Sequence, residues 1–217
     1  MRRAALFDMD RTLVRKETAS LYVKFQRDIG EASARDTLRV LVWALQYTFG
    51  VIDVREVAER AFLVFEGLPE DVLRRRCEEM FHRYVKMHIS EEAKRAVRSH
   101  QERGDICAIV TGASAYATKP VADVFNIEHM VTTEFAIDPN GCLTGRLVDP
   151  LCYAEGKIER SERLAQSLGF DLREATFYSD SFTDLPLLLH VKEPVVVNPD
   201  PRLRKVARER GWRTEKW

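Results

Sequence analysis

The chain opens with a change from apolar to polar residues that is typical of a buried strand ending at a site. Ala4 to Phe7 form an apolar run, and Asp8, Asp10 and Thr12 follow it closely. Short apolar runs bounded by polar, turn-forming residues are typical of buried strands, and the sites of open α/β sheets lie at the carboxyl ends of their strands. We therefore expect two carboxylates and a hydroxyl at one such end, although a strand followed by two turn-forming acids is also common without a site.

A helical pattern begins after Val14 and continues to about His88. Apolar residues recur at three- and four-residue spacings, and glycines separate the segments. The expected helices are Thr18–Ile29, Ala32–Phe49, Val54–Phe65 and Pro69–Val85. We predict an all-helical cap over residues 16–88, which would lie above the active end of the first strand, exclude water and select substrates.

The segment 38–52 within this region is apolar on nearly every side of its predicted helix. Such a helix is usually buried, and here it could lie in the core of the cap, against a partner chain or around an apolar substrate. It is too short to cross a bilayer, which needs about 20 apolar residues. No stable membrane insertion is therefore expected.

Strands and helices alternate from Glu91 onward. The expected strands are Ile106–Val110, Met130–Ala136, Leu143–Val148, Ala175–Ser179 and Val195–Val197. The expected helices are Glu91–Arg103, Ala115–Phe125, Lys157–Leu168, Leu185–Leu189 and Arg202–Arg210. This alternation predicts an α/β fold with a doubly wound parallel sheet, formed by residues 1–15 and 89–217.

Two helix starts carry residues suited to binding phosphate. Thr111 and Gly112 precede a predicted helix, where a hydroxyl, a backbone amide and the helix N-terminus can bind phosphate oxygens. The same residues could also cap the helix in the ordinary way. Lys157 lies in a first helical turn, which is unfavourable for a cation, so we expect an anionic partner for it unless it is an ordinary surface lysine.

Another predicted strand also ends in carboxylates. Asp180 together with Asp8 would supply hard oxygen ligands for Mg²⁺, and Asp184 could orient Lys157 or a metal-bound water. Asp8 should be ionised, because an unperturbed Asp titrates near about 3.9, so it could attack phosphorus without a separate base. Asp10 could then protonate the leaving oxygen and later activate water.

The order of these motifs resembles that of the haloacid dehalogenase superfamily of phosphatases. FDMDRTLV, VTGAS, GK and YSDSFTD follow one another over Ala4 to about Asn198. Within the superfamily the chain looks closest to the phosphoserine-phosphatase-like branch, and the ending VVVNPDPRLRKVARERGW is similar to that of bacterial relatives named histidinol-phosphatases. The resemblance implies a Rossmann-like core with a helical cap inserted after the first motif.

The resemblance also implies a mechanism. Asp8 would attack phosphorus to form an aspartyl-phosphate, and Asp10 would act as general acid and then as general base. Thr111 and Lys157 would hold the transferring phosphoryl group. Mg²⁺ would be bound by the Asp8 carboxylate, the Asp10 backbone carbonyl and the Asp180 carboxylate. The residues expected to bind phosphate or to support those that do are Thr12, Gly112 and Asp184.

The substrate is less well defined by the sequence than the reaction. The resemblance places Glu17 where phosphoserine phosphatases read an amino group, although a glutamate there could also stabilise the first turn of a helix. The lid arginine that would grip a carboxylate is displaced by one residue, to Arg60, and Thr183 replaces a usual asparagine. The expected substrate is a small phosphorylated metabolite, amine-bearing, with phosphoserine and histidinol phosphate as candidates.

Composition narrows the partners. The 34 basic and 34 acidic residues of the 217 cancel, so no global field favours nucleic acid, and a small-molecule phosphomonoester is the expected partner. The four cysteines lack the spacing of zinc or redox motifs, and we expect reduced thiols and a cytoplasmic location. The five histidines show no ligand spacing and receive no role. A homodimer and the role of Arg11 are left open.

Three other functions stay open at this stage. The apolar segment of the cap is also consistent with a phosphatase for lysophospholipid-like monoesters. A regulatory module that binds phosphate without turnover is a second alternative, although such a module would have no need of the general acid Asp10. Transfer of the phosphoryl group to another alcohol instead of water is a third, because both reactions share the aspartyl-phosphate.

Overall fold

A seven-stranded, mostly parallel sheet forms the centre of the molecule. The structure is a computed structural model that describes residues 2–30 and 62–217. The strand order is β4-β3-β2-β1-β5-β6-β7, and within the described residues only β4 runs antiparallel to its neighbour. The strands are β1 (Ala4–Phe7), β2 (Ile106–Ser114), β3 (His129–Ile137), β4 (Leu143–Val148), β5 (Thr176–Ser179), β6 (Glu193–Val197) and β7 (Arg213–Glu215).

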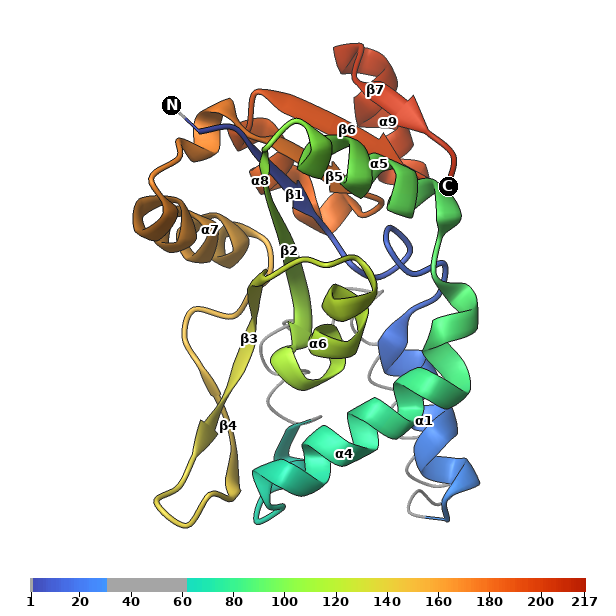
Figure 1. Cartoon of the computed structure of the whole chain (residues 1–217), viewed down its shortest axis with the longest axis vertical. Helices are drawn as coiled ribbons and strands as arrows, with labels where there is room; N and C mark the ends of the chain where they lie inside the picture. The colour runs from blue at the N-terminus through green and yellow to red at the C-terminus, as the bar shows by residue number, and fades with distance from the viewer. Residues whose placement is uncertain (1, 31–61) are drawn as a thin grey trace.

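Helices cover both faces of this sheet, so the doubly wound arrangement is confirmed (Figure 1). Successive residues of β1 point to opposite faces: Phe7 packs in the cluster with α5 and α6, and Leu6 in the cluster with α7, α8 and α9. Both faces are therefore apolar, which explains the continuous apolar run in the sequence. The helices are α5 (Glu91–Glu102), α6 (Ala115–Val124), α7 (Glu155–Leu168), α8 (Leu185–His190) and α9 (Pro201–Arg210).

From Glu91 onward every expected strand and helix is present, with small differences at the ends of several of them. We expected a strand ending at Val110, whereas β2 continues to Ser114, which pairs with Thr133 of β3 after a register shift. Strand β7 was not predicted, since its three residues include two charged ones and carry no apolar alternation. The helix expected over Pro69–Val85 becomes α4 (Glu70–Met80), followed by a π-helical turn, Phe81–Val85.

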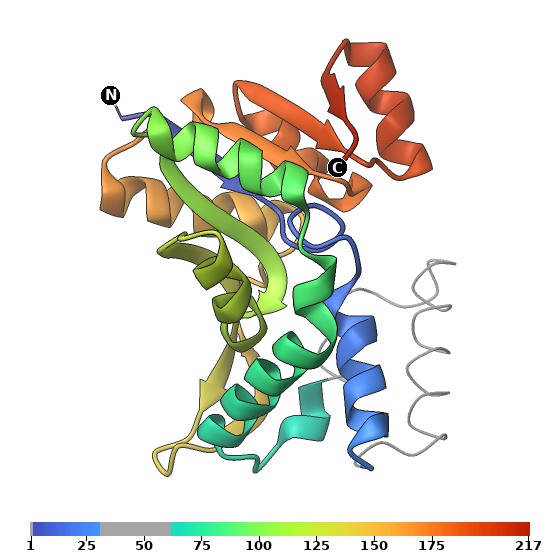
Figure 2. The same ribbon diagram turned by 45° about the vertical axis from the view of Figure 1, so that its right-hand side comes forward.

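A separate helical region lies beyond the carboxyl ends of the central strands. It contains α1 (Thr18–Asp28) and α4, which pack side by side in both views (Figures 1 and 2). A short 3-10 helix, Leu63–Phe65, joins them to the β3–β4 hairpin. The predicted helix Ala32–Phe49 and the apolar segment 38–52 lie outside the described residues. So does the predicted helix Val54–Phe65 up to residue 61, and its described end forms the 3-10 helix.

The chain enters and leaves this helical region at adjacent points. Val14 and Ile89 form an antiparallel bridge. The Arg15 amide donates to the His88 carbonyl at 2.8 Å, and the Ser90 amide donates to the Leu13 carbonyl at 3.0 Å. The outgoing and returning segments are thus hydrogen-bonded to each other beyond the carboxyl end of β1.

The four cysteines are all free, and Cys77, Cys107 and Cys152 are buried, as expected for small apolar side chains. In the part of the chain that the structure describes, no helix has the length and apolar character needed to cross a membrane.

Candidate active site

The residues singled out from the sequence meet in one cavity at the carboxyl ends of β1, β2 and β5. The cavity has a volume of about 550 Å³. Among the predicted site residues, its lining includes Asp8, Asp10, Glu17, Thr111, Gly112, Lys157, Asp180, Thr183 and Asp184. They come together because the carboxyl ends of parallel strands share one edge of a sheet. Arg60 lies outside the described residues.

Lys157 joins two of these carboxylates. Its Nζ lies 2.8 Å from Asp8 Oδ1 and 2.7 Å from Asp184 Oδ1, and the residue is only 3% exposed. Burial alone would lower the pKa of Lys157, but the negative charges of Asp184 and Asp8 outweigh it and raise that pKa above its ordinary value. The lysine is therefore a fixed cation, with the anionic partners that its place in a first helical turn led us to expect.

The helix start that carries Lys157 depends on a glycine. A Cβ atom at Gly156 would overlap the carbonyl oxygen of Leu151, so a larger residue would push α7 away from the sheet. The GK pair thus combines a close backbone approach with a buried cation.

Asp8 and Asp180 lie close to each other at the base of the cavity. Burial raises the pKa of Asp8 to about 7, against the opposing charge of Lys157. Burial and the negative charge of Asp8 together raise the pKa of Asp180 to about 8. Among the described residues no hydrogen bond is made to Asp8 Oδ2, so this oxygen is available to react.

Asp10 connects the site to the helical region. Its Oδ1 accepts from the Thr18 amide at 3.0 Å and its Oδ2 accepts from the Thr18 hydroxyl at 3.1 Å. Burial raises the pKa of Asp10 to about 6, although both hydrogen bonds from Thr18 act to lower it. Thr18 is the first residue of α1, and no pattern in the sequence indicates its contact with Asp10.

Arg11, left without a role above, lies at the rim of the cavity. Its Nε is 3.3 Å from Asp180 Oδ2, and its Nη1 is 3.5 Å from Glu17 Oε1. Its φ of 58° is in the left-handed region, which is unusual for a long side chain. Glu17 thus lines the cavity, as a residue that binds a substrate amine would, but it also forms an ion pair with Arg11.

The hydroxyl residues of the site differ in their surroundings. Thr111 is buried, and its Oγ1 accepts from the Ala113 amide at 3.2 Å. Thr183 lines the cavity and shares a 2.8 Å hydrogen bond with the Ser181 hydroxyl. Thr12 is fully buried, and its hydroxyl has no hydrogen-bond partner within the described chain. It is not among the cavity-lining residues, so the structure places it behind the site.

Two supporting residues were not anticipated from the sequence. Ser179 is fully buried and its hydroxyl donates to Asp184 Oδ2 at 2.7 Å. Asp200 lines the cavity and caps α9, accepting from the Leu203 amide at 2.9 Å, and it also accepts from the Phe182 amide at 2.6 Å. Ser179 is part of the YSDSFTD motif, so its spacing was the available signal. Asp200 is visible in the sequence only as a helix cap.

The donor set fits a magnesium ion. Within the described residues, no group of three or more His, Cys, Asp or Glu side chains is arranged to hold a metal by itself. Mg²⁺ typically takes one or two carboxylates and completes its shell with waters and substrate phosphate. Asp8 and Asp180 are two buried carboxylates whose proximity is unfavourable without a cation, so these residues match that requirement.

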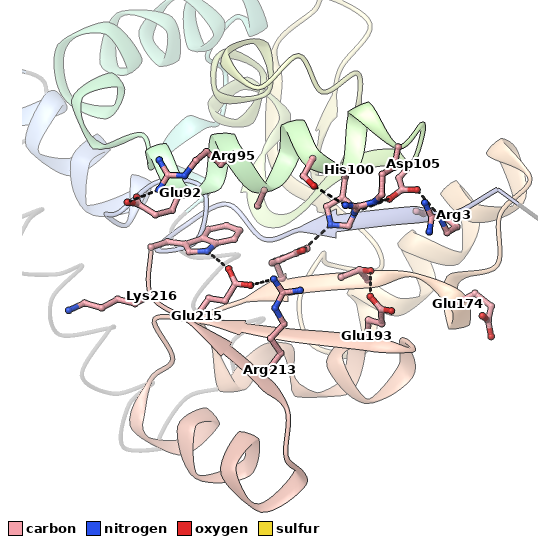
Figure 3. Close-up of a pocket in the computed structure, with 17 residues that line it drawn as sticks. Arg3, Glu92, Arg95, His100, Asp105, Glu174, Glu193, Arg213, Glu215 and Lys216 are labelled. Atoms are coloured by element: carbon pink, nitrogen blue, oxygen red, sulfur yellow. Dashed lines mark hydrogen bonds and ion pairs between the residues drawn. The ribbon is translucent and has the colours of Figure 1, made fainter.

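A second cavity of about 600 Å³ lies between α5 and the strands β5, β6 and β7. Figure 3 shows Arg95 and His100 on α5 facing Arg213 and Glu215 on β7. None of the predicted site residues lines it among those the structure describes. We refer to it below as the α5 groove.

Sequence comparison identifies the family. The model of the haloacid dehalogenase-like hydrolases matches residues 5–189. The chain is 33% identical over 223 residues to a protein of Neisseria meningitidis serogroup C (strain 8013) named histidinol-phosphatase, covering 98% of this chain and 97% of that protein. It is 31% identical over 216 residues to the Mycobacterium tuberculosis (strain ATCC 25618 / H37Rv) protein named phosphoserine phosphatase SerB1, covering 96% of this chain and 69% of that one.

Structural comparison agrees with this family. A protein of unknown function from Bordetella pertussis Tohama I superposes with a TM-score of 0.92 at 31% identity, covering 99% of this chain and 98% of that one. A substrate-bound phosphoserine phosphatase superposes with a TM-score of 0.68 at 17% identity, covering 94% and 90%. The second likeness shows the fold alone, a parallel sheet with a cap domain, and confirms the predicted fold class. By its sequence and its fold, the chain belongs to the haloacid dehalogenase-like hydrolase family and is a phosphatase.

Proposed function

We propose that the protein hydrolyses phosphomonoesters with Mg²⁺ through a covalent intermediate on Asp8. The observation that carries this proposal is the position of Lys157, whose Nζ binds one oxygen of Asp8 and also Asp184. A lysine in this position fixes the Asp8 carboxylate and places positive charge where a phosphoryl group would bind. Asp10 lines the same cavity, and two hydrogen bonds from Thr18 hold its carboxylate.

The first step transfers the phosphoryl group to the enzyme. Asp8 Oδ2 attacks phosphorus while the bond from phosphorus to the ester oxygen breaks, and Asp10 donates its proton to that oxygen. Lys157 and Thr111 bind the phosphoryl oxygens, whose charge spreads in the transition state. The products of the step are the free alcohol and an aspartyl-phosphate.

The second step restores the enzyme. Asp10, now ionised, takes a proton from a water molecule as the water oxygen bonds to phosphorus. The bond between phosphorus and Asp8 breaks, inorganic phosphate leaves, and the Asp8 carboxylate is regenerated. Because Thr18 holds both oxygens of Asp10, the same carboxyl group is in place for both proton transfers.

The carboxylates Asp8 and Asp180, with the backbone carbonyl of Asp10, would hold the magnesium ion. A bound Mg²⁺ neutralises the repulsion between nucleophile and phosphate. The excess of acidic side chains around the cavity supports the binding of a cation there. Among the described residues its lining has two basic side chains, Arg11 and Lys157. The acidic ones are Asp8, Asp10, Glu17, Asp180, Asp184 and Asp200.

The helical region would act as the cap, with boundaries at residues 16 and 88. Glu17, at the N-terminus of α1, and Thr18, its first residue, line the cavity, so substrates would be selected by this region. The favoured substrates are small amine-bearing phosphomonoesters, phosphoserine or histidinol phosphate. The names of the Neisseria and Mycobacterium relatives support these candidates, and Glu17 at the cavity supports an amine.

Phosphate release from a substrate panel tests this function. The panel contains phosphoserine, histidinol phosphate, sugar phosphates, nucleotides and an aryl phosphate, each with Mg²⁺ and with a chelator. We expect release that requires Mg²⁺ and is strongest for an amine-bearing ester. Release from none of them would favour a binding module or a phosphotransferase. The cytoplasmic location and the homodimer stay predictions from the sequence.

A further inference from the structure

The active-site cavity has a second wall that the proposed chemistry does not use. Opposite the carboxylates, the lining comes from α1, from the 3-10 helix Leu63–Phe65 and the residue before it, from α4 and from β3. The side chains on this wall that matter for the argument are Tyr22, Phe62, Phe65, Leu73 and Phe135. Transfer of a phosphoryl group needs none of these carbon surfaces.

The aromatic rings of this wall are packed against one another in a defined way. The Phe62 and Phe135 ring centroids are 4.8 Å apart at an interplanar angle of 84°, and those of Phe65 and Phe135 are 6.0 Å apart at 78°. Tyr22 lies 5.9 Å from Phe65. Edge-to-face packing of this kind fixes the rings, so the wall is a formed surface and not a set of loose side chains.

We infer that this wall is a binding subsite for an apolar group on the alcohol part of the substrate. The group is at least the size of an aromatic ring or a short alkyl chain. The cavity volume of about 550 Å³ is in the range of small-molecule pockets, which are mostly apolar with a few placed polar groups. This inference rests on the proposed phosphatase activity, and it favours bodies larger and more apolar than that of phosphoserine.

A series of alkyl phosphates isolates the contribution of the wall. We would measure kcat/KM with Mg²⁺ for ethyl, butyl and hexyl phosphate, with phosphoserine and phosphoethanolamine alongside. Burial of one methylene group is worth about fourfold in binding, so kcat/KM should rise by about fifteenfold for each two carbons until the subsite is filled.

Substitutions at the wall test the assignment directly. In Phe65→Asn the ratio of kcat/KM for hexyl phosphate to that for ethyl phosphate should fall at least tenfold, whereas Phe65→Leu should largely keep it. Val64→Asn provides a second test at a cavity-lining residue that is 63% exposed and so tolerates a polar side chain. Leu189→Asn is the matched control, because Leu189 is 47% exposed on α8 and does not line the cavity. It should leave the ratio unchanged.

The results separate this inference from the proposed function. If the wild-type enzyme releases phosphate from none of these esters, the proposed function itself fails. If it hydrolyses ethyl phosphate as well as hexyl phosphate, the phosphatase stands and the apolar subsite is overturned. The same conclusion follows if Phe65→Asn folds normally and keeps the full dependence on chain length.

Discussion

The active-site cavity and the α5 groove have similar volumes, about 550 and 600 Å³, but the described lining of the first is strongly acidic and that of the second is balanced in charge. The described lining of the active site has six acidic and two basic side chains. The described lining of the α5 groove has five of each. Its basic residues are Arg3, Arg95, Arg103, Arg213 and Lys216, and its acidic residues are Glu92, Asp105, Glu174, Glu193 and Glu215.

The buried groups of the α5 groove are paired within the protein. His100 Nδ1 lies 2.8 Å from Asp105 Oδ2, and its Nε2 lies 2.9 Å from the Tyr178 hydroxyl. Asp105 also binds Arg3 at 3.0 Å and Arg103 at 3.2 Å. In the active site, by contrast, Asp8 and Asp180 raise the cost of each other's charge. A cavity whose charges are already matched is part of the fold, whereas an excess of one sign calls for a ligand.

The largest expected effect is that of Asp8→Asn. The nucleophile is lost, so kcat for an aryl phosphate should fall by about 10⁴-fold or more. The melting temperature measured in chelator should not fall, because burial already favours the neutral form of this group. Turnover within tenfold of the wild type would contradict the role of Asp8. The active-site cavity would then no longer differ from the α5 groove in its chemistry.

The next largest effect is expected for Lys157→Gln. The amide removes the positive charge between Asp8 and Asp184, and kcat should fall by about 10²–10³-fold, as for other preorganised electrostatic groups. Lys94→Gln is the control, since it makes the same change in an exposed pair with Glu91 and should leave kcat unchanged. Equal kcat values for the two variants would show that the buried cation plays no part in the reaction.

Addition of Mg²⁺ should stabilise the folded protein by binding at the active site and not at the α5 groove. At a concentration 100 times its Kd, a ligand raises the free energy of unfolding by about 2.7 kcal/mol. Differential scanning calorimetry should show this increase for the wild type and for Asp105→Asn, but not for Asp180→Asn. Chelator should stop turnover. An equal increase in Asp180→Asn would place the cation elsewhere.

Asp105→Asn should have the converse profile, a loss of stability without a loss of activity. The change leaves His100 and two arginines without their carboxylate. We expect the free energy of unfolding to fall by about 1–2 kcal/mol, a modest value because Arg3 and Arg103 are exposed to screening solvent. Urea unfolding measures the loss of stability, and kcat/KM shows whether activity is kept. A drop in kcat/KM beyond about twofold would link the α5 groove to catalysis.

The smallest effect concerns pH. Burial, with the charge of Arg103, lowers the pKa of His100 below its ordinary 6.5, although Asp105 and Glu193 act in the other direction. The folded protein therefore binds fewer protons at this group than the unfolded chain does. The stability it contributes is complete above pH 6.5 and is lost as the pH falls through the folded pKa.

Unfolding midpoints in urea between pH 8 and pH 5 measure this dependence. The wild type should lose stability toward pH 5, and His100→Gln should have a flatter profile while keeping the hydrogen bond to the Tyr178 hydroxyl. A wild-type profile that is no steeper than that of His100→Gln would show that the buried histidine contributes nothing to the pH dependence.

Most of the residues that meet at the active-site cavity could be predicted from the sequence. The apolar run before Asp8 and the polar residues after later strands were local signals, and parallel strands bring such residues to one edge. The pairing of Lys157 with Asp184 was also expected. The roles assigned to these residues remain proposals that the variants above test.

The remaining features depend on contacts between distant residues. His100 received no role from the sequence, because its partner Tyr178 is 78 positions away and no spacing rule connects them. The contact of Arg11 with Asp180 depends on a left-handed backbone at Arg11, which its sequence does not indicate. The apolar wall is assembled from four separate elements, and its outline exists only once they are folded.

The bridge between Val14 and Ile89 has a consequence for how such an enzyme could change over time. The chain leaves the sheet and returns to it at neighbouring, hydrogen-bonded points, so the sheet is closed whatever lies between them. Segments of different length or composition could be exchanged there without moving Asp8, Lys157 or Asp180. New substrates could thus be acquired by replacing one module, while the reaction itself is inherited unaltered.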